Sequence, residues 1–149
     1  MLGLGNPILC DDGVGNQVAQ ILDSEINNPE VTVTETNAVG LGLLDFLPGY
    51  ERLIIIDAIQ TQEGKAGQVH RLSLPDLVTP RHFSSAHDTD LATAFELGTK
   101  LGLALPQGVI IFAIEVADVT TFSEECTPEV KGAIPEVIRL VLRELGGAY

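Results

Sequence analysis

The sequence predicts an α/β domain with three layers, in which helices cover both faces of a twisted, mainly parallel sheet. Apolar runs at 52–58 (RLIIIDA) and 108–117 (GVIIFAIEVA) show little polar alternation. Such runs are typical of parallel strands that are covered on both faces. Segments with apolar residues at helical spacing separate and follow these strands, and strands that alternate with helices favour a parallel sheet.

The first third of the chain begins with a strand, a glycine-rich turn and a helix. Residues 1–4 (MLGL) predict the end of a strand, which is so short that we expect the natural protein to start upstream of Met1. Residues 14–26 predict the first helix, which ends at an Asn-Asn-Pro turn signal. The alternating, β-branched segment 31–36 (VTVTET) predicts a strand near a sheet edge, because one of its faces is polar.

The middle of the chain is expected to be more irregular. Residues 40–47 (GLGLLDFL) predict a short apolar helix that ends before Pro48 and Gly49. Residues 60–68 contain two glycines and predict a turn, and residues 69–72 predict a brief strand that would be antiparallel to its neighbour. Residues 75–85 have no periodicity and are expected to be irregular.

Two helices are predicted in the last third, around the 108–117 strand. Residues 90–103 carry an apolar stripe at helical spacing. Residues 127–145 predict the last helix, with Thr127 as its cap and a proline in its first turn. Pro135 lies inside this helix and is expected to kink or split it.

Length and composition limit the possible functions. A chain of 149 residues, 45% hydrophobic and 19% charged, is expected to form one globular domain over residues 1–149. Its net charge of −13 disfavours nucleic-acid binding, because phosphates would be repelled. The two distant cysteines suit a reducing cytoplasm, and no apolar run is long enough for a membrane span. A monomer is the default expectation.

Two adjacent carboxylates, Asp11 and Asp12, precede the first predicted helix. One of them is expected to be the N-cap, because free N–H groups and the helix dipole favour an acid there. Capping does not explain a second carboxylate on a loop at the carboxyl edge of a sheet, so the pair is also a candidate site.

Three residues are predicted at this edge: Asp12 after the first strand, Asp57 at the end of the 52–58 strand, and His87 just before a helix. Two carboxylates and an imidazole with open positions suit a transition metal such as Ni, Zn, Co or Mn. Each residue also has a structural explanation, since Asp57 could accept backbone N–H bonds and His87 could lie on the surface. His70 and His82 are expected to be structural or solvent-exposed.

Other familiar chemistries fit poorly. The sequence has no GxSxG elbow, HExxH motif or P-loop, and its opening GLGNPI lacks the third glycine of a dinucleotide fingerprint. Cys10 is expected to be a poor nucleophile, because the neighbouring carboxylates raise the pKa of a thiol.

Four segments in order, GLGNPILCDDGVG, IIIDA, SSAHDTDL and TPEVKGAIPEVIRLVL, resemble the nickel–iron hydrogenase maturation endopeptidases along the whole chain. The resemblance implies a five-stranded α/β sandwich of the phosphorylase/hydrolase-like type, with one antiparallel edge strand. It implies removal of a C-terminal extension from the hydrogenase large-subunit precursor after nickel insertion. Asp12, Asp57 and His87 would be both the metal-contacting and the catalytic residues. The nickel would come with the precursor, and no organic cofactor is implied.

The sequence departs from the family pattern at two places. Many members have Asp-Gly-Gly-Thr-x-Gly after the second strand, where this chain has Glu35 followed by Thr-Asn-Ala-Val-Gly. The SSAHDTDL segment keeps its histidine but carries two further acids, Asp88 and Asp90.

The resulting hypothesis is that nickel in the precursor supplies the cation that Asp12, Asp57 and His87 lack in the free protein. Metal loading would then be a checkpoint for cleavage. The alternatives are a non-catalytic nickel-binding chaperone, a peptidyl-tRNA hydrolase, whose family also opens with GLGNP, and a plain ligand-binding α/β domain. A hydrolase acting on RNA would need a basic groove and an early histidine, and this chain has no histidine before His70.

Overall fold

A mainly parallel sheet forms the centre of the molecule. The computed structural model describes residues 1–78, 83–84 and 88–146; of residues 78, 83, 84 and 88–90 only the backbone is described. Five strands lie in the order β2-β1-β3-β6-β4, and of these five β4 alone is antiparallel to its neighbour, β6. A two-residue strand, β5, pairs with the end of β3. The bounds are β1 Leu2–Leu4, β2 Thr34–Thr36, β3 Arg52–Thr61, β4 Val69–Ser73, β5 Phe83–Ser84 and β6 Gly108–Glu115.

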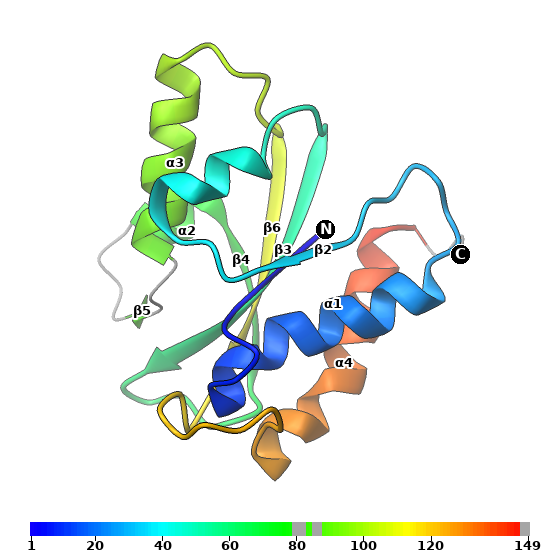
Figure 1. The fold of residues 1–149 in the computed structure, drawn as a ribbon, viewed down its shortest axis with the longest axis vertical. Helices are drawn as coiled ribbons and strands as arrows, with labels where there is room; N and C mark the ends of the chain where they lie inside the picture. Colours follow the sequence, from blue (N-terminus) through cyan, green and yellow to red (C-terminus); the bar gives the residue numbers. More distant parts are fainter. Residues whose placement is uncertain (79–82, 85–87, 147–149) are drawn as a thin grey trace.

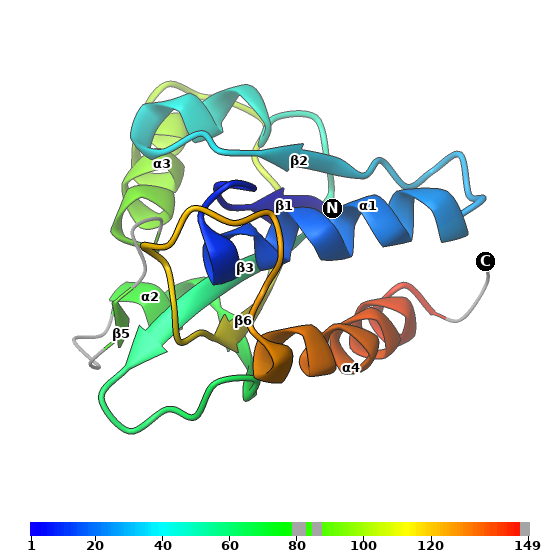
Figure 2. The same cartoon turned by 60° about the horizontal axis from the view of Figure 1, so that its bottom comes forward.

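Helices cover both faces of this sheet, as predicted (Figures 1 and 2). One face packs against α1 (Val14–Glu25) and α4 (Pro128–Glu144), which lie side by side. The other face packs against α3 (Asp88–Lys100) and the 3-10 helix η2 (Gly40–Asp45). The short helix α2 (Leu74–Val78) follows β4. The expected three-layer α/β architecture, with five main strands and one antiparallel edge strand, is confirmed.

The two central strands have no polar face, which explains their apolar runs. Alternate residues of β3 enter the two cores: Ile54 and Ile56 pack with α1 and α4, whereas Leu53 and Ile55 pack on the α3 side. Strand β2 lies at the edge of the sheet, as its alternating sequence indicated, although it is only three residues long.

Pro135 was predicted to kink or split the last helix; α4 runs unbroken from Pro128 to Glu144, so of these two outcomes the split does not occur. Pro135 lies on the exposed side of α4. The buried stripe on the other side, which includes Val130, Val137 and Val141, holds the helix against the sheet. Burial of an apolar stripe stabilises a helix by more than one missing backbone hydrogen bond costs.

Two predictions for the middle of the chain need correction. Strand β3 continues to Thr61, so the turn predicted over residues 60–68 is right for residues 62–68 and wrong for the first two. Residues 74–78 are helical rather than irregular, because the Asp76 carboxylate accepts hydrogen bonds from the N–H and the hydroxyl of Ser73, each at 2.7 Å. The bond from the Ser73 N–H to the Asp76 carboxylate is one half of a capping box, whose Ser-x-x-Asp signature was present in the sequence. None of the helices in the described part of the chain is long and apolar enough to cross a membrane.

Candidate active site

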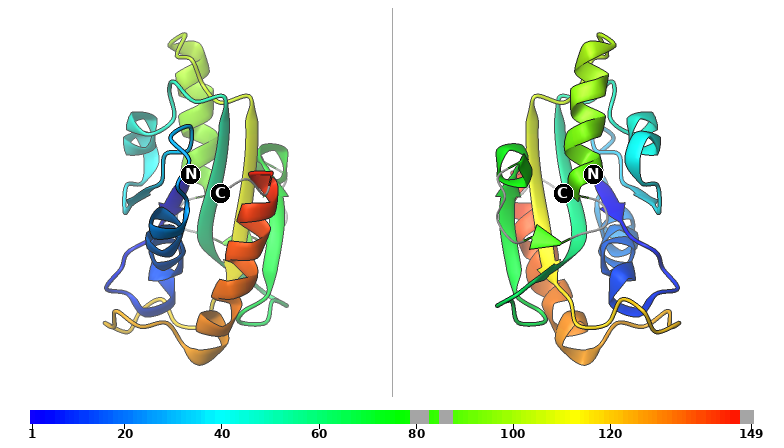
Figure 3. Two further views of the ribbon diagram at one scale, coloured as in Figure 1. Left: turned by 90° about the vertical axis from the view of Figure 1, so that its right-hand side faces the viewer. Right: turned by 90° about the vertical axis from the view of Figure 1, so that its left-hand side faces the viewer.

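The loops that follow β1 and β6 meet at the carboxyl edge of the sheet. Figure 3 shows residues 5–13 and 116–127 at the same end of the molecule, opposite the last turn of α3. The two loops form a parallel bridge between Leu9 and Ser123. The Ser123 N–H donates to the Ile8 carbonyl at 3.0 Å, and the Cys10 N–H donates to the Ser123 carbonyl at 2.8 Å. Backbone hydrogen bonds therefore hold the two loops next to each other at this edge of the sheet.

Asp11 joins these loops through its side chain. It is fully buried, and its carboxylate accepts the N–H groups of Ala117 and Asp118 at 3.0 Å and of Thr127 at 2.6 Å. The Thr127 hydroxyl donates to the same carboxylate at 3.0 Å. Ionised acceptors make the stronger class of hydrogen bond. Asp11 thus fixes the end of β6 and the start of α4 to the first loop.

The prediction that Asp11 or Asp12 caps the first helix is wrong. Both lie in a 3-10 turn, η1 (Cys10–Gly13), and the N-cap of α1 is Gly13, without a side-chain cap bond. The turn carries the chain into α1 without a break, so the position where an acid would cap the helix is occupied by a glycine. Asp11 instead accepts from N–H groups more than 100 residues away in the sequence.

Asp12 is half-buried, and its carboxylate accepts one hydrogen bond among the described residues, from the Asn6 N–H to the Oδ2 atom at 2.9 Å. Its backbone packs on Gly5, where an added Cβ would lie 1.9 Å from the Asp12 carbonyl oxygen. Gly5 also has a φ of +150°, which strains any other residue. The glycine therefore brings the Asp12 turn directly onto the carboxyl end of β1.

Asp57 lies on β3 at the level where β1 ends. The parallel register pairs Leu2 with Ile55, which places Asp57 opposite Leu4. The side chain is only 2% exposed, and one oxygen accepts the Ala58 N–H at 2.8 Å. Asp57 was predicted at the end of its strand, but β3 continues for four more residues, of which the first two pair with β6 and the last two with β5. It still lies at the carboxyl edge of β1.

His87 lies outside the described residues, so the structure does not test the predicted trio. Residues 79–82, which include His82, also lie outside the described part. Within that part, no three His, Cys, Asp or Glu side chains are grouped so that they could hold a metal ion. The assignment of Asp12, Asp57 and His87 stays a prediction.

A second buried polar cluster at this edge was missed by the sequence analysis. Glu115, at the end of β6, is 2% exposed and accepts hydrogen bonds from the Thr61 N–H at 3.1 Å and from the Thr61 hydroxyl. The Nε2 atom of His70 lies 3.1 Å from its Oε1 atom. The cluster joins the ends of β3, β4 and β6. A glutamate inside the apolar run FAIEVA was the available signal, because a carboxylate is buried only with partners.

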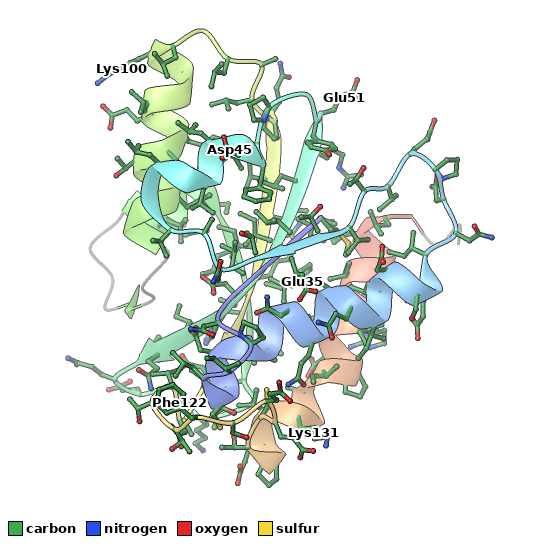
Figure 4. All side chains as sticks on the ribbon, in the orientation of Figure 1. Glu35, Asp45, Glu51, Lys100, Phe122 and Lys131 are labelled. Carbon is green, nitrogen blue, oxygen red and sulfur yellow. The ribbon has the colours of Figure 1, made fainter. Side chains whose placement is uncertain are left out.

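Two further expectations concern residues beside the site. Glu35 is exposed and accepts from the Gln20 amide of α1 at 3.0 and 3.1 Å, so its contact is with the helix rather than with the Asp12 turn (Figure 4). Burial, followed by the nearby Asp11 carboxylate, raises the pKa of the Cys10 thiol. This supports the expectation that Cys10 is a poor nucleophile.

Two surface hollows lie at the other end of the sheet. Two open depressions, of about 520 and 570 Å³, share the lining residues Gly49 to Arg52, at the start of β3. They contain none of the predicted site residues.

Comparisons with known proteins agree with this architecture. A family model described as hydrogenase maturation protease matches residues 16–144, which include Asp57 and His87 and begin four residues after Asp12. The hydrogenase expression/formation protein HupD of Rhizobium leguminosarum bv. viciae is 24% identical over 97% of this chain and 72% of its own length. HupD of Bradyrhizobium diazoefficiens is 25% identical over 97% and 76%.

Among solved structures, the hydrogenase maturating endopeptidase HybD from E. coli superposes with a TM-score of 0.81 at 23% identity, covering 97% of this chain and 91% of that one. This likeness shows a shared fold. The family model covers most of the chain, and the chain therefore belongs to the hydrogenase maturation proteases, a family of peptidases.

Proposed function

We propose that this peptidase removes the C-terminal extension of a [NiFe]-hydrogenase large-subunit precursor after nickel has been inserted. In this proposal, Asp12, Asp57 and His87 recognise the nickel that the precursor carries. The membership of the chain in the hydrogenase maturation proteases supports the substrate class and disfavours a peptidyl-tRNA hydrolase or a plain ligand-binding domain.

The different environments of the two adjacent aspartates carry the proposal for the site. The carboxylate of Asp11 accepts hydrogen bonds from three backbone N–H groups and from a hydroxyl group. The carboxylate of Asp12 accepts one hydrogen bond among the described residues. An ionised carboxylate has about four acceptor positions. Asp12 therefore keeps lone pairs that can contact a cation or take a proton from an attacking water.

The strand pairings support the other two assignments. Asp57 lies opposite the last residue of β1, from which the chain turns toward Asp12. Ser84, three residues before His87 in the sequence, pairs with Gln60, three residues after Asp57 on β3. The described segment that precedes His87 in the sequence, β5, is thus paired with the strand that carries Asp57.

A bound nickel ion would change the affinity of the enzyme for its substrate. The carboxylates of Asp12 and Asp57, in a chain of net charge −13, would attract the nickel ion that the precursor carries. A difference of about 4 kcal/mol between loaded and empty precursor would correspond to roughly a thousandfold difference in affinity. Because Asp57 is almost fully buried, the proposal also requires the site to open when the precursor docks.

A cleavage time course tests this function. Purified precursor, with and without nickel, is mixed with the enzyme, and its mass is followed by mass spectrometry. We expect cleavage of the nickel-loaded precursor only, and loss of cleavage in Asp12→Asn, Asp57→Asn and His87→Ala. Asp23→Asn, which removes an exposed carboxylate from α1, is the matched control and should cut normally.

Two results would contradict the proposal. If the enzyme cut the empty precursor as fast as the nickel-loaded precursor, cleavage would not depend on nickel. Tight binding of loaded precursor without any shortening would instead favour a non-catalytic chaperone.

A further inference from the structure

Two large apolar side chains stand exposed beside the Asp12 turn. Ile8 is 47% exposed and Phe122 is 81% exposed. They directly precede the bridged pair Leu9 and Ser123, and the Ser123 N–H donates to the Ile8 carbonyl at 3.0 Å, so the two residues lie on neighbouring backbone segments. We call these two side chains the Ile8–Phe122 patch. Figure 4 shows Phe122 at the loop end of the molecule, close to the start of α1.

The backbone under the patch is held firmly. Asp11 fixes the Phe122 loop at both of its ends, through Asp118 and Thr127. The Gln17 amide of α1 donates to the Glu124 carbonyl at 2.9 Å, next to the patch. An exposed aromatic side chain on a fixed loop loses little freedom on binding, and preorganisation of this kind favours affinity.

Acidic residues surround the patch on the same loop. Hydrogen bonds from Thr121 and Thr120 lower the pKa of Asp118 to about 2, so this carboxylate is ionised at neutral pH. Glu124 and Glu125 are exposed. Lys131 lies 3.8 Å from Glu125, and no described basic residue forms an ion pair with Asp118 or Glu124. The surroundings of the patch therefore carry uncompensated negative charge.

We propose that the Ile8–Phe122 patch docks a basic surface of the hydrogenase precursor, with an apolar side chain of that surface resting between Ile8 and Phe122. The inference rests on the proposed function and deepens it, because it names what the enzyme contacts outside the metal. Buried aromatic side chains dominate the affinity of many interfaces, whereas charged residues at the rim mainly speed association.

Binding of purified precursor to the intact enzyme tests the proposal. Affinity is measured by surface plasmon resonance for the wild type, Phe122→Ser and Ile8→Ser. Leu101→Ser is the matched control, because Leu101 is 62% exposed and directly follows Lys100, which lies at the opposite end of the molecule from Phe122 (Figure 4). We expect Phe122→Ser to raise the Kd about thirtyfold, the change for truncation of a buried anchor. The control should stay within about twofold of the wild type, inside the range of exposed surface substitutions.

The charge is tested with Glu124→Gln, which should slow association at low salt and weaken its salt dependence, with little change in the dissociation rate. Equal Kd values for Phe122→Ser and Leu101→Ser would overturn the docking proposal, as would the absence of any binding by the wild type.

The failure of this proposal can be distinguished from the failure of the proposed function. Cleavage of the precursor with an unchanged KM in Phe122→Ser would leave the function intact and remove the docking site. Binding that depends on Phe122 without cleavage would leave the docking site intact and remove the assigned reaction.

Discussion

Replacing Asp11 by asparagine separates the structural aspartate of the pair from the one proposed for the site. An asparagine keeps the shape of the side chain but has one acceptor oxygen instead of two. In its better orientation the amide oxygen still accepts from Ala117 and Asp118. The amide NH2 group then faces the Thr127 N–H, whose bond to the carboxylate is 2.6 Å long in the wild type.

The size of the effect follows from these contacts. One charge-assisted hydrogen bond is lost, a buried N–H is left without an acceptor, and the remaining bonds lose the charge. Together these changes lower the free energy of unfolding by about 3 to 5 kcal/mol. For a chain of this length the melting temperature should fall by about 10 °C, at about 2 to 4 °C per kcal/mol.

Thermal melts of Asp11→Asn and Asp12→Asn, followed by circular dichroism, provide the comparison. Asp12 accepts one N–H, and an amide oxygen can keep that bond, so we expect Asp12→Asn to lower the melting temperature by only about 2 °C. The Asp12→Asn variant should instead fail to cleave the precursor. Equal melting temperatures for the two variants would refute the division of roles between the aspartates.

The remaining predictions concern packing, pH and the second polar cluster. Gly15→Ala would place a Cβ 2.5 Å from the Ile56 carbonyl oxygen and should lower the free energy of unfolding in urea by about 3 kcal/mol. The folded pKa of Asp118 is about 2 and its ordinary value is 3.8, so its contribution to stability is present above pH 4 and is lost as the pH falls through about 2. Asp118→Ala should therefore melt below the wild type at pH 7, and the difference should vanish near pH 2. Glu115→Gln removes one acceptor from a buried cluster that includes His70 and should lower the free energy of unfolding by about 2 kcal/mol in urea. If one of these variants is as stable as the wild type, the contact that it changes does not contribute to stability.

The central fold could be predicted from the sequence because its signals are local. The apolar runs in β3 and β6 and the stripe along α4 each identify an element by themselves. The short elements were missed where the signal was a single contact, as in the Asp76 cap of α2. The extension of β3 to Thr61 depends on its pairing with β6 and β5, which a glycine-containing segment does not show in its own sequence.

The candidate site could be predicted only in part for a similar reason. The order of strands and turns predicted that Asp12 and Asp57 lie at the carboxyl edge. The role of Asp11 could not be deduced, because its partners come from a loop more than 100 residues away. The partners of Glu115 lie on two other strands, and only the position of the glutamate in an apolar run indicated that it has any.

The affinity of the enzyme for nickel-loaded and for empty precursor, measured by the same binding assay in the wild type and in Asp12→Asn, tests the proposed recognition most directly. We expect the wild type to bind the loaded precursor roughly a thousandfold more tightly, and Asp12→Asn to lose most of that preference while its affinity for the empty precursor stays the same. A preference for the loaded precursor that is the same in both proteins would contradict the assignment of Asp12.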